Sequence, residues 1–144
     1  MTQEDCTELA GDAGVGLFSL TAAAMGAGPV IAVEGDLFAA RDLKRNANGS
    51  IAVLELPVEN FVSRSAGPVA TVIVDPPRTG MSKEAMARAI AIGAPRFVYV
   101  SCDIATLARD ARVLLDAGYR IASMRAFDLF PNTAHVETVI SFSR

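Results

Sequence analysis

The sequence has few of the residues that metal sites and disulfide frameworks need. It contains one histidine and two cysteines, Cys6 and Cys102, and no Cys-x-x-Cys pair. These are too few soft ligands for a zinc site, and two cysteines do not make a disulfide framework. We therefore expect neither a metal nor a structure built on disulfides.

Runs of positive charge are also missing. The 144 residues include 13 lysines and arginines against 16 aspartates and glutamates, a formal net charge of −3, and the longest basic run is Lys44-Arg45. A self-sufficient nucleic-acid-binding domain usually carries a basic face, which this chain lacks. The hydrophobic fraction of 51% excludes intrinsic disorder. A chain of this length forms one domain and buries roughly 70% of its unfolded surface.

No stretch of the sequence fits a leader or a membrane span. The first five residues include Glu4 and Asp5 and no positive charge, whereas a signal peptide begins with positive charge. Residues 13–33 are uncharged, but four glycines and Pro29 interrupt them, so they make a poor spanning helix. We expect a cytoplasmic protein without membrane contacts.

Short β-branched runs alternate with helical patterns along the chain. The expected strands cover residues 7–10, 30–33, 69–74, 97–100, 119–126 and 134–142, and the expected helices cover 17–25, 37–46, 82–92 and 104–117. Continuous apolar runs suit strands that are buried on both faces of a parallel sheet. The last two strands have no helix between them and should pair antiparallel. The pattern predicts an α/β fold with a doubly wound, mostly parallel Rossmann-like sheet and an antiparallel strand near the C-terminus.

The last helix pattern has clear end signals. Its apolar residues recur at helical spacing, Asp103 is a plausible N-cap, and Gly118 is suited to end the helix. In such sheets, ligands bind beyond the carboxyl ends of the strands, at the point where the strand order reverses. Four motifs of this sequence follow or begin expected strands.

The first motif is a glycine turn between the first strand and the first helix. Gly14 and Gly16 allow a ligand to approach the backbone closely at a helix N-terminus. Glu34, at the end of the second strand, can accept hydrogen bonds from both ribose hydroxyls of a nucleoside. The pattern fits a dinucleotide or an adenosylmethionine site, and its alternative is a simple tight turn.

The second and third motifs follow two apolar strands. Asp75-Pro-Pro-Arg78 comes directly after residues 69–74, and its prolines fix a rigid extended turn from which Asp75 could bind a flat polar ring. The alternative is a loop that only ends the strand. Cys102 lies between a strand and a helix N-terminus, whose field favours a thiolate. The alternative is an inert buried cysteine, and we expect Cys6 to be structural.

The fourth motif begins the final strand. His135 alone is more often a structural residue than a functional one. Glu137 follows two residues later on the same face of the strand, where its carboxylate could act as a general base.

Taken in order, these motifs resemble the RNA 5-methyluridine (uracil-C5) methyltransferase family. The matching segments are residues 14–20, 33–35, 75–80, 99–110 and 130–138. The resemblance implies a class I methyltransferase fold and transfer of a methyl group from S-adenosylmethionine to C5 of a uridine in tRNA or rRNA. It does not distinguish between these two RNA classes.

The resemblance also implies a role for each motif. Cys102 would add to C6 of the uracil, Glu137 would remove the C5 proton, and Asp75 would bind the flipped base. The cofactor-binding residues would be Gly14, Gly16, Glu34 and Asp75.

Two features of the sequence depart from the family pattern. Ala10 stands where family members usually carry an aspartate, and Asp12 is the nearby acidic residue. Family members are longer and have an RNA-binding part before the catalytic domain. We therefore expect residues 1–144 to be the catalytic domain alone, with most RNA contacts in an N-terminal part that is absent here.

Two alternatives from other classes remain. One is a non-catalytic remnant that keeps the fold and binds the cofactor or a protein partner; it is favoured by Ala10 and opposed by the presence of Cys102 and Glu137. The other is a nicotinamide-dependent dehydrogenase. Ser19 opposes this second alternative because it stands where the third glycine of the dinucleotide fingerprint belongs.

Overall fold

The computed structural model describes residues 7–61, 68–129 and 131–144. Its strands are β1 (Thr7–Gly11), β2 (Val30–Glu34), β3 (Ala52–Glu55), β4 (Val69–Val74), β5 (Arg96–Ser101), β6 (Arg120–Phe127) and β7 (Glu137–Ser143). Its helices are α1 (Leu17–Ala24), α2 (Leu37–Ala47), the short 3₁₀ helix η2 (Val58–Asn60), α3 (Lys83–Ala91) and α4 (Ile104–Asp116). The expectation for Cys6 falls outside the described residues.

The seven strands form one sheet in the order β3-β2-β1-β4-β5-β7-β6. Strands β1 to β5 are parallel to their neighbours, whereas β7 is antiparallel to both β5 and β6. The strand order reverses between β1 and β4, because the chain builds outward from β1 to β3 and then returns to add β4 beside β1. The predicted fold class and the antiparallel final pair are confirmed.

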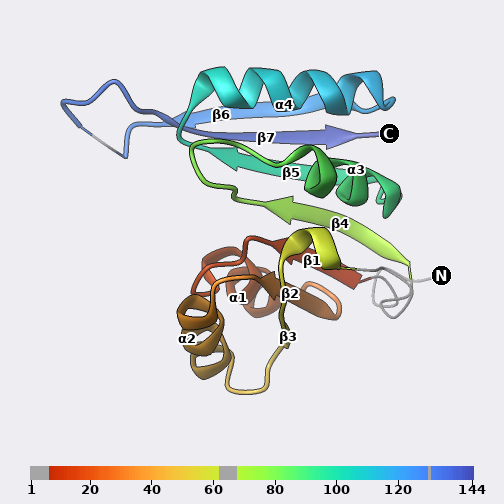
Figure 1. Cartoon of the computed structure of the whole chain (residues 1–144), viewed down its shortest axis with the longest axis vertical. Coiled ribbons are helices and arrows are strands. Elements are labelled where there is room, and N and C mark those ends of the chain that lie inside the picture. The colour runs from red at the N-terminus through yellow and green to blue at the C-terminus, as the bar shows by residue number, and fades with distance from the viewer. Residues whose placement is uncertain (1–6, 62–67, 130) are drawn as a thin grey trace.

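The helices divide between the two halves of the sheet (Figure 1). Helices α1 and α2 lie against the half with β1 to β3, and α3 and α4 lie over the half with β4 to β7. The core beneath α3 and α4 includes fully buried aromatic side chains, among them Phe97, Tyr99 and Phe142. The segment between β6 and β7 projects from the body at the upper left of the view.

Two details of the sheet differ from the sequence prediction. Strand β3 was not predicted, although residues 51–54 are apolar; it is a short edge strand of four residues whose side chains are half-buried or exposed. Strand β7 begins at Glu137, three residues later than predicted. The predicted helix 104–117 is confirmed, because the Asp103 carboxylate accepts a hydrogen bond from the Thr106 N–H and Gly118 follows the last turn with φ +92°.

Candidate active site

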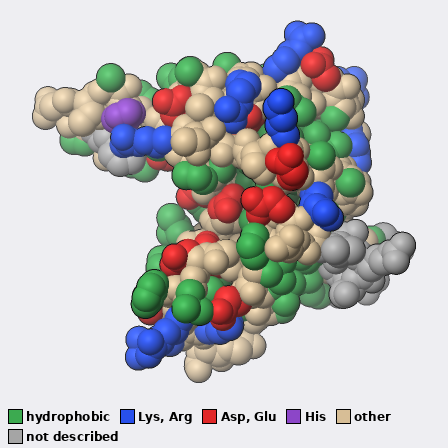
Figure 2. Space-filling model, in the orientation of Figure 1, with side chains coloured by type: hydrophobic (Ala, Val, Ile, Leu, Met, Phe, Trp, Pro, Cys, Tyr) green, Lys and Arg blue, Asp and Glu red, His purple; other side chains and the backbone are tan. Residues whose placement is uncertain are grey.

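The predicted site residues lie at one edge of the sheet, where β1, β2, β4 and β5 end and β7 begins. This edge includes the point between β1 and β4 at which the strand order reverses, the usual ligand position in such folds. Acidic side chains gather there, beside the hollow on the left of Figure 2. The structure therefore brings the predicted glycine turn and the predicted carboxylates to the same edge.

The glycine turn and Glu34 are in direct contact. The Gly14 N–H donates to Glu34 Oε2 at 2.7 Å, and the Asp36 N–H donates to Glu34 Oε1 at 2.7 Å. Glu34 is buried, so these backbone donors fix the orientation of its carboxylate at the end of β2. A Cβ built on Gly14 meets nothing within 4 Å, which leaves open space next to the turn. This arrangement suits a ligand that brings hydroxyl donors to a carboxylate.

Gly16 has a structural reason for being glycine. It is the N-cap of α1 with φ +106°, and a Cβ there would lie 2.7 Å from the side chains of Leu20 and Leu43. Its absence of a side chain lets α1 begin close to α2, and this places the turn beside Glu34.

Asp12 is a partly buried acidic residue near three other carboxylates, a setting that the sequence alone did not show. Burial raises the pKa of Asp12 to about 6, and the negative charges of Glu34, Glu59 and Asp75 contribute to the shift. Ala10, by contrast, is buried within β1. Asp12 therefore supplies a carboxylate at the carboxyl end of β1, at a cost to the folded state.

We predict that Asp12→Asn stabilises the free chain at neutral pH. Asparagine tolerates the positive φ of +50° at this position and removes a partly desolvated charge. After allowance for solvent screening, the gain should be about 1 kcal/mol. For a chain of this size such a gain raises Tm by about 2–4 °C.

The pH dependence follows from the raised pKa. Above pH 6, Asp12 is charged in the folded and the unfolded chain, and the folded state bears the full cost. As the pH falls from about 6 towards the ordinary value of 3.8, the folded state takes up the proton first and the cost disappears. Thermal unfolding at pH 7.5 and pH 4 measures this, with Asp42→Asn on the exposed face of α2 as control. An equal increase in Tm of the Asp12→Asn variant at both pH values would contradict the prediction.

The antiparallel register brings Cys102 and Glu137 to the same edge of the sheet. The last residue of β5, Ser101, pairs with Thr138 of β7, so Cys102 directly follows the end of β5 at the edge where Glu137 begins β7. On its other side, Glu137 pairs with Phe127 of β6. Cys102 is a partly exposed free cysteine. A thiol and a carboxylate from separate segments therefore lie at one edge of the sheet.

The carboxylates of this edge interact electrostatically. Partial burial, followed by the negative charge of Glu137, raises the pKa of Asp75 to about 6. Burial also raises the pKa of Glu137. A carboxylate with a raised pKa is a better proton acceptor near neutral pH. Asp75, Glu137 and Cys102 thus place two carboxylates with raised pKa values and a thiol at one edge of the sheet.

The turn that carries Cys102 is fixed by the cap of α4. The Ser101 hydroxyl donates to the Asp103 carbonyl at 3.0 Å, and the Asp103 N–H donates to the Ser101 hydroxyl at 3.1 Å. Hydrogen bonds from the Thr106 N–H and hydroxyl lower the pKa of Asp103, and the charge of nearby His135 contributes to a smaller extent. The start of β7 therefore lies close to the N-terminus of α4.

Comparison with known proteins identifies the family. The family model described as tRNA (Uracil-5-)-methyltransferase matches residues 62–144, which include Asp75, Cys102 and Glu137. The chain belongs to the tRNA (uracil-5-)-methyltransferase family. This confirms the resemblance drawn from the motifs and sets aside the nicotinamide-dependent alternative.

Relatives in the curated collection carry matching names. An uncharacterized RNA methyltransferase of Thermotoga maritima is 40% identical over 133 residues, covering 90% of this chain and 30% of the relative. The 23S rRNA (uracil(1939)-C(5))-methyltransferase RlmD of Acidithiobacillus ferrooxidans is 38% identical over 142 residues, covering 91% of this chain and 31% of the relative. The chain therefore spans about a third of the length of these relatives.

A solved structure agrees in fold. The crystal structure of Pyrococcus abyssi tRNA (uracil-54, C5)-methyltransferase, in complex with S-adenosyl-L-homocysteine, matches with a TM-score of 0.82 and 35% identity over 95% of this chain and 34% of that one. A solved structure from Pyrococcus horikoshii, described as that of a putative RNA methyltransferase, matches at 22% identity and a TM-score of 0.75 and supports the fold alone. The class I methyltransferase fold expected from the sequence is confirmed.

The remaining predictions concern metals and membranes. Among the described residues, no group of three or more histidine, cysteine, aspartate or glutamate side chains could hold a metal ion. In the same part of the chain, no helix is long and apolar enough to cross a membrane.

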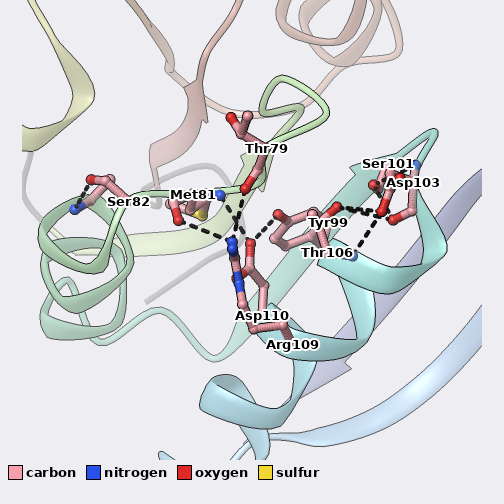
Figure 3. A network of polar contacts seen from close by, with 10 residues as sticks. Thr79, Met81, Ser82, Tyr99, Ser101, Asp103, Thr106, Arg109 and Asp110 are labelled. Carbon is pink, nitrogen blue, oxygen red and sulfur yellow. Dashed lines mark hydrogen bonds and ion pairs between the residues drawn. The ribbon is translucent and has the colours of Figure 1, made fainter.

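A polar network in this family member was not predicted from the sequence (Figure 3). Arg109 and Asp110 of α4 contact Tyr99 of β5 and the loop that follows β4. A signal was present in the sequence, because Asp110 falls on the apolar face of α4 between Leu107 and Leu114. A carboxylate on a buried helix face needs partners, and these could not be named without the fold.

Proposed function

We propose that this chain forms the catalytic part of an enzyme that methylates C5 of a uridine in tRNA or rRNA through a covalent cysteine adduct. The observation that carries the proposal is that Cys102 follows β5 at the sheet edge where Glu137 begins β7, with Asp75 close enough for its pKa to respond to Glu137. C5 of uracil is too weak a nucleophile to take a methyl group unaided. A nucleophile and a base in one place meet that chemical need.

The steps follow from the properties of the residues. The Cys102 thiolate adds to C6 of the uracil, and the electron pair of the C5–C6 double bond moves to the ring carbonyl to give an enolate. S-adenosylmethionine supplies an electrophilic methyl group when bound. The enolate carbon C5 would form the new bond to that methyl group as the methyl–sulfur bond breaks, and S-adenosylhomocysteine would be the leaving group. Glu137 then takes the C5 proton, the C5–C6 double bond re-forms, and the Cys102 thiolate leaves.

The other carboxylates have supporting roles in this proposal. Asp75 would hydrogen-bond the uracil after it has left its stack. Glu34, already oriented by the Gly14 and Asp36 amides, would accept hydrogen bonds from the ribose hydroxyls of the cofactor. Gly14 and Gly16 would allow the cofactor to approach the backbone closely. S-adenosylmethionine is a cation at its sulfonium centre, and an acidic sheet edge favours a cation.

We also propose that most RNA contacts lie outside residues 1–144. The chain spans about a third of the relatives' length and has a net charge of −3, which gives it little attraction for phosphates. Residues 1–144 would then act as the catalytic domain of a longer family architecture.

Cofactor binding tests the proposal directly. We expect calorimetry to detect binding of S-adenosylhomocysteine, and Glu34→Gln to weaken it about tenfold or more, because a charged hydrogen-bond acceptor is lost. Glu55→Gln is the matched control: Glu55 pairs with Glu34 in the β2–β3 register but bonds Lys44. Absence of binding at millimolar ligand would contradict the enzymatic function and favour a remnant.

A further inference from the structure

Two residues of α4 form hydrogen bonds with the loop that follows β4 (Figure 3). The Asp110 carboxylate accepts hydrogen bonds from the Met81 N–H at 2.9 Å and the Tyr99 hydroxyl at 2.5 Å. Arg109 Nη2 donates to the carbonyl oxygens of Thr79 at 3.0 Å and Met81 at 3.3 Å. Three hydrogen bonds therefore tie residues 79–81 to α4.

The same two residues form an ion pair. Arg109 Nε donates to Asp110 Oδ1 at 2.8 Å, and Asp110 is only 3% exposed. Burial alone would raise the pKa of Asp110, but hydrogen bonds from Arg109, Tyr99 and Met81 outweigh burial and lower it. The carboxylate is thus charged, and both of its oxygens are occupied. A buried charge with all its partners in place fixes the geometry of those partners.

Gly80 is the residue that lets the loop approach this pair. It has φ +74°, and a Cβ at this position would lie 2.6 Å from Asp110 Oδ2 and would clash with the Arg109 guanidinium. The glycine that ends the Asp75-Pro-Pro-Arg-Thr-Gly80 motif is therefore required by the ion pair and by the backbone conformation.

The loop and the helix carry different parts of the candidate site. The loop begins with Asp75, and α4 begins two residues after Cys102. The Ser101 and Asp103 hydrogen bonds fix the Cys102 turn to the first turn of α4, and Asp110 lies about two turns further along the helix. The Arg109–Asp110 pair thus joins the element that bears Asp75 to the element that bears Cys102.

We propose that Arg109 and Asp110 are positioning residues, which hold Asp75 and Cys102 in one arrangement around the substrate base. They act through the loop and not on the reacting atoms. The proposal rests on the function proposed above, because it assigns the network a role in that reaction. A loop displaced by even 1 Å would slow the reaction, since the reacting groups must meet in a narrow range of geometry.

The test compares Arg109→Gln with Arg112→Gln in the same chain. Arg112 is the matched control, because it lies on the exposed side of α4 and pairs with Asp116 at 3.0 Å, away from the loop. Amide hydrogen exchange reports on the loop, and adduct formation with a 5-fluorouridine RNA reports on the reaction. Amide exchange in β5 and β2 reports on the general stability of the sheet.

We expect Arg109→Gln to raise exchange at the Gly80 and Met81 amides at least about tenfold and to slow adduct formation about tenfold or more. Exchange in β5 and in β2, the strand that carries Glu34, should change less than about threefold. General destabilisation would alter all four quantities, so this split distinguishes positioning from a purely structural role. Arg112→Gln should change none of them.

A second pair of variants approaches the contact from the loop. Gly80→Ala should reproduce the effects of Arg109→Gln, whereas Gly49→Ala, with a similar φ of +82° but open space around it, should not. An unchanged loop exchange in Arg109→Gln, or an opened loop with a wild-type adduct rate, would overturn the proposal. A wild-type chain that forms no adduct would instead contradict the proposed function, and the exchange data would still decide whether the pair holds the loop.

Discussion

Replacing Cys102 by alanine is expected to abolish the covalent adduct with RNA that contains 5-fluorouridine. In the proposed reaction of the wild-type chain, the thiolate adds to C6 and the methyl group reaches C5. Fluorine at C5 cannot leave as a proton, so the protein stays bound to the RNA and shows as a shifted band on a denaturing gel. Without the thiol, the adduct and the methylation of ordinary uridine should fall by about 10⁴-fold or more.

Cys6→Ala is the control for this experiment and should leave the adduct intact. If the 144-residue chain binds RNA too weakly, the N-terminal part of a longer relative can be joined to it, and the same variants can be compared in that chimaera. Methylation of uridine by a protein with alanine at position 102 would show that the cysteine mechanism is wrong.

Glu137→Gln is expected to block a step that follows the addition of Cys102 to C6. Addition to C6 and methyl transfer still proceed, but the C5 proton has no base to accept it. Turnover should fall by about 10²- to 10⁴-fold, and a methylated adduct should accumulate on ordinary uridine RNA. Mass spectrometry of the trapped complex identifies the added methyl group and the modified cysteine.

Glu84→Gln provides the comparison, because Glu84 lies exposed in the first turn of α3. It should turn over at the wild-type rate without an adduct. If Glu137→Gln lost turnover without accumulating the methylated complex, Glu137 would act in an earlier step or only in folding.

Most strands of the sheet could be predicted because their sequences are continuous apolar runs. The run from Val69 to Val74 is apolar on both faces, which only a strand covered on both sides requires, and the structure ends that strand at the predicted residue. Helix α4 was equally clear from its periodicity, its Asp103 cap and Gly118. Strand β3 was missed although residues 51–54 are apolar, because so short an apolar run does not by itself identify a strand.

The candidate site could be predicted only in part from the sequence, for a different reason. Motifs at strand ends indicate which edge carries the chemistry, but not which side chains touch. The placement of Cys102 and Glu137 at one sheet edge depends on the β5–β7 register, and the raised pKa of Asp12 depends on its burial and on carboxylates from three other segments. The bond between Asp110 and Met81 joins residues 29 positions apart in sequence, a separation that no local pattern encodes.

Strand β7 has a consequence for how the molecule is made. It follows β6 in sequence but lies between β5 and β6 in the sheet, so β6 has no partner until β7 has left the ribosome. The same strand carries Glu137, the proposed base. A fragment that stops before β7 therefore lacks both the strand that joins β5 to β6 and the residue proposed to remove the C5 proton, so one strand insertion would complete the sheet and the proposed site together.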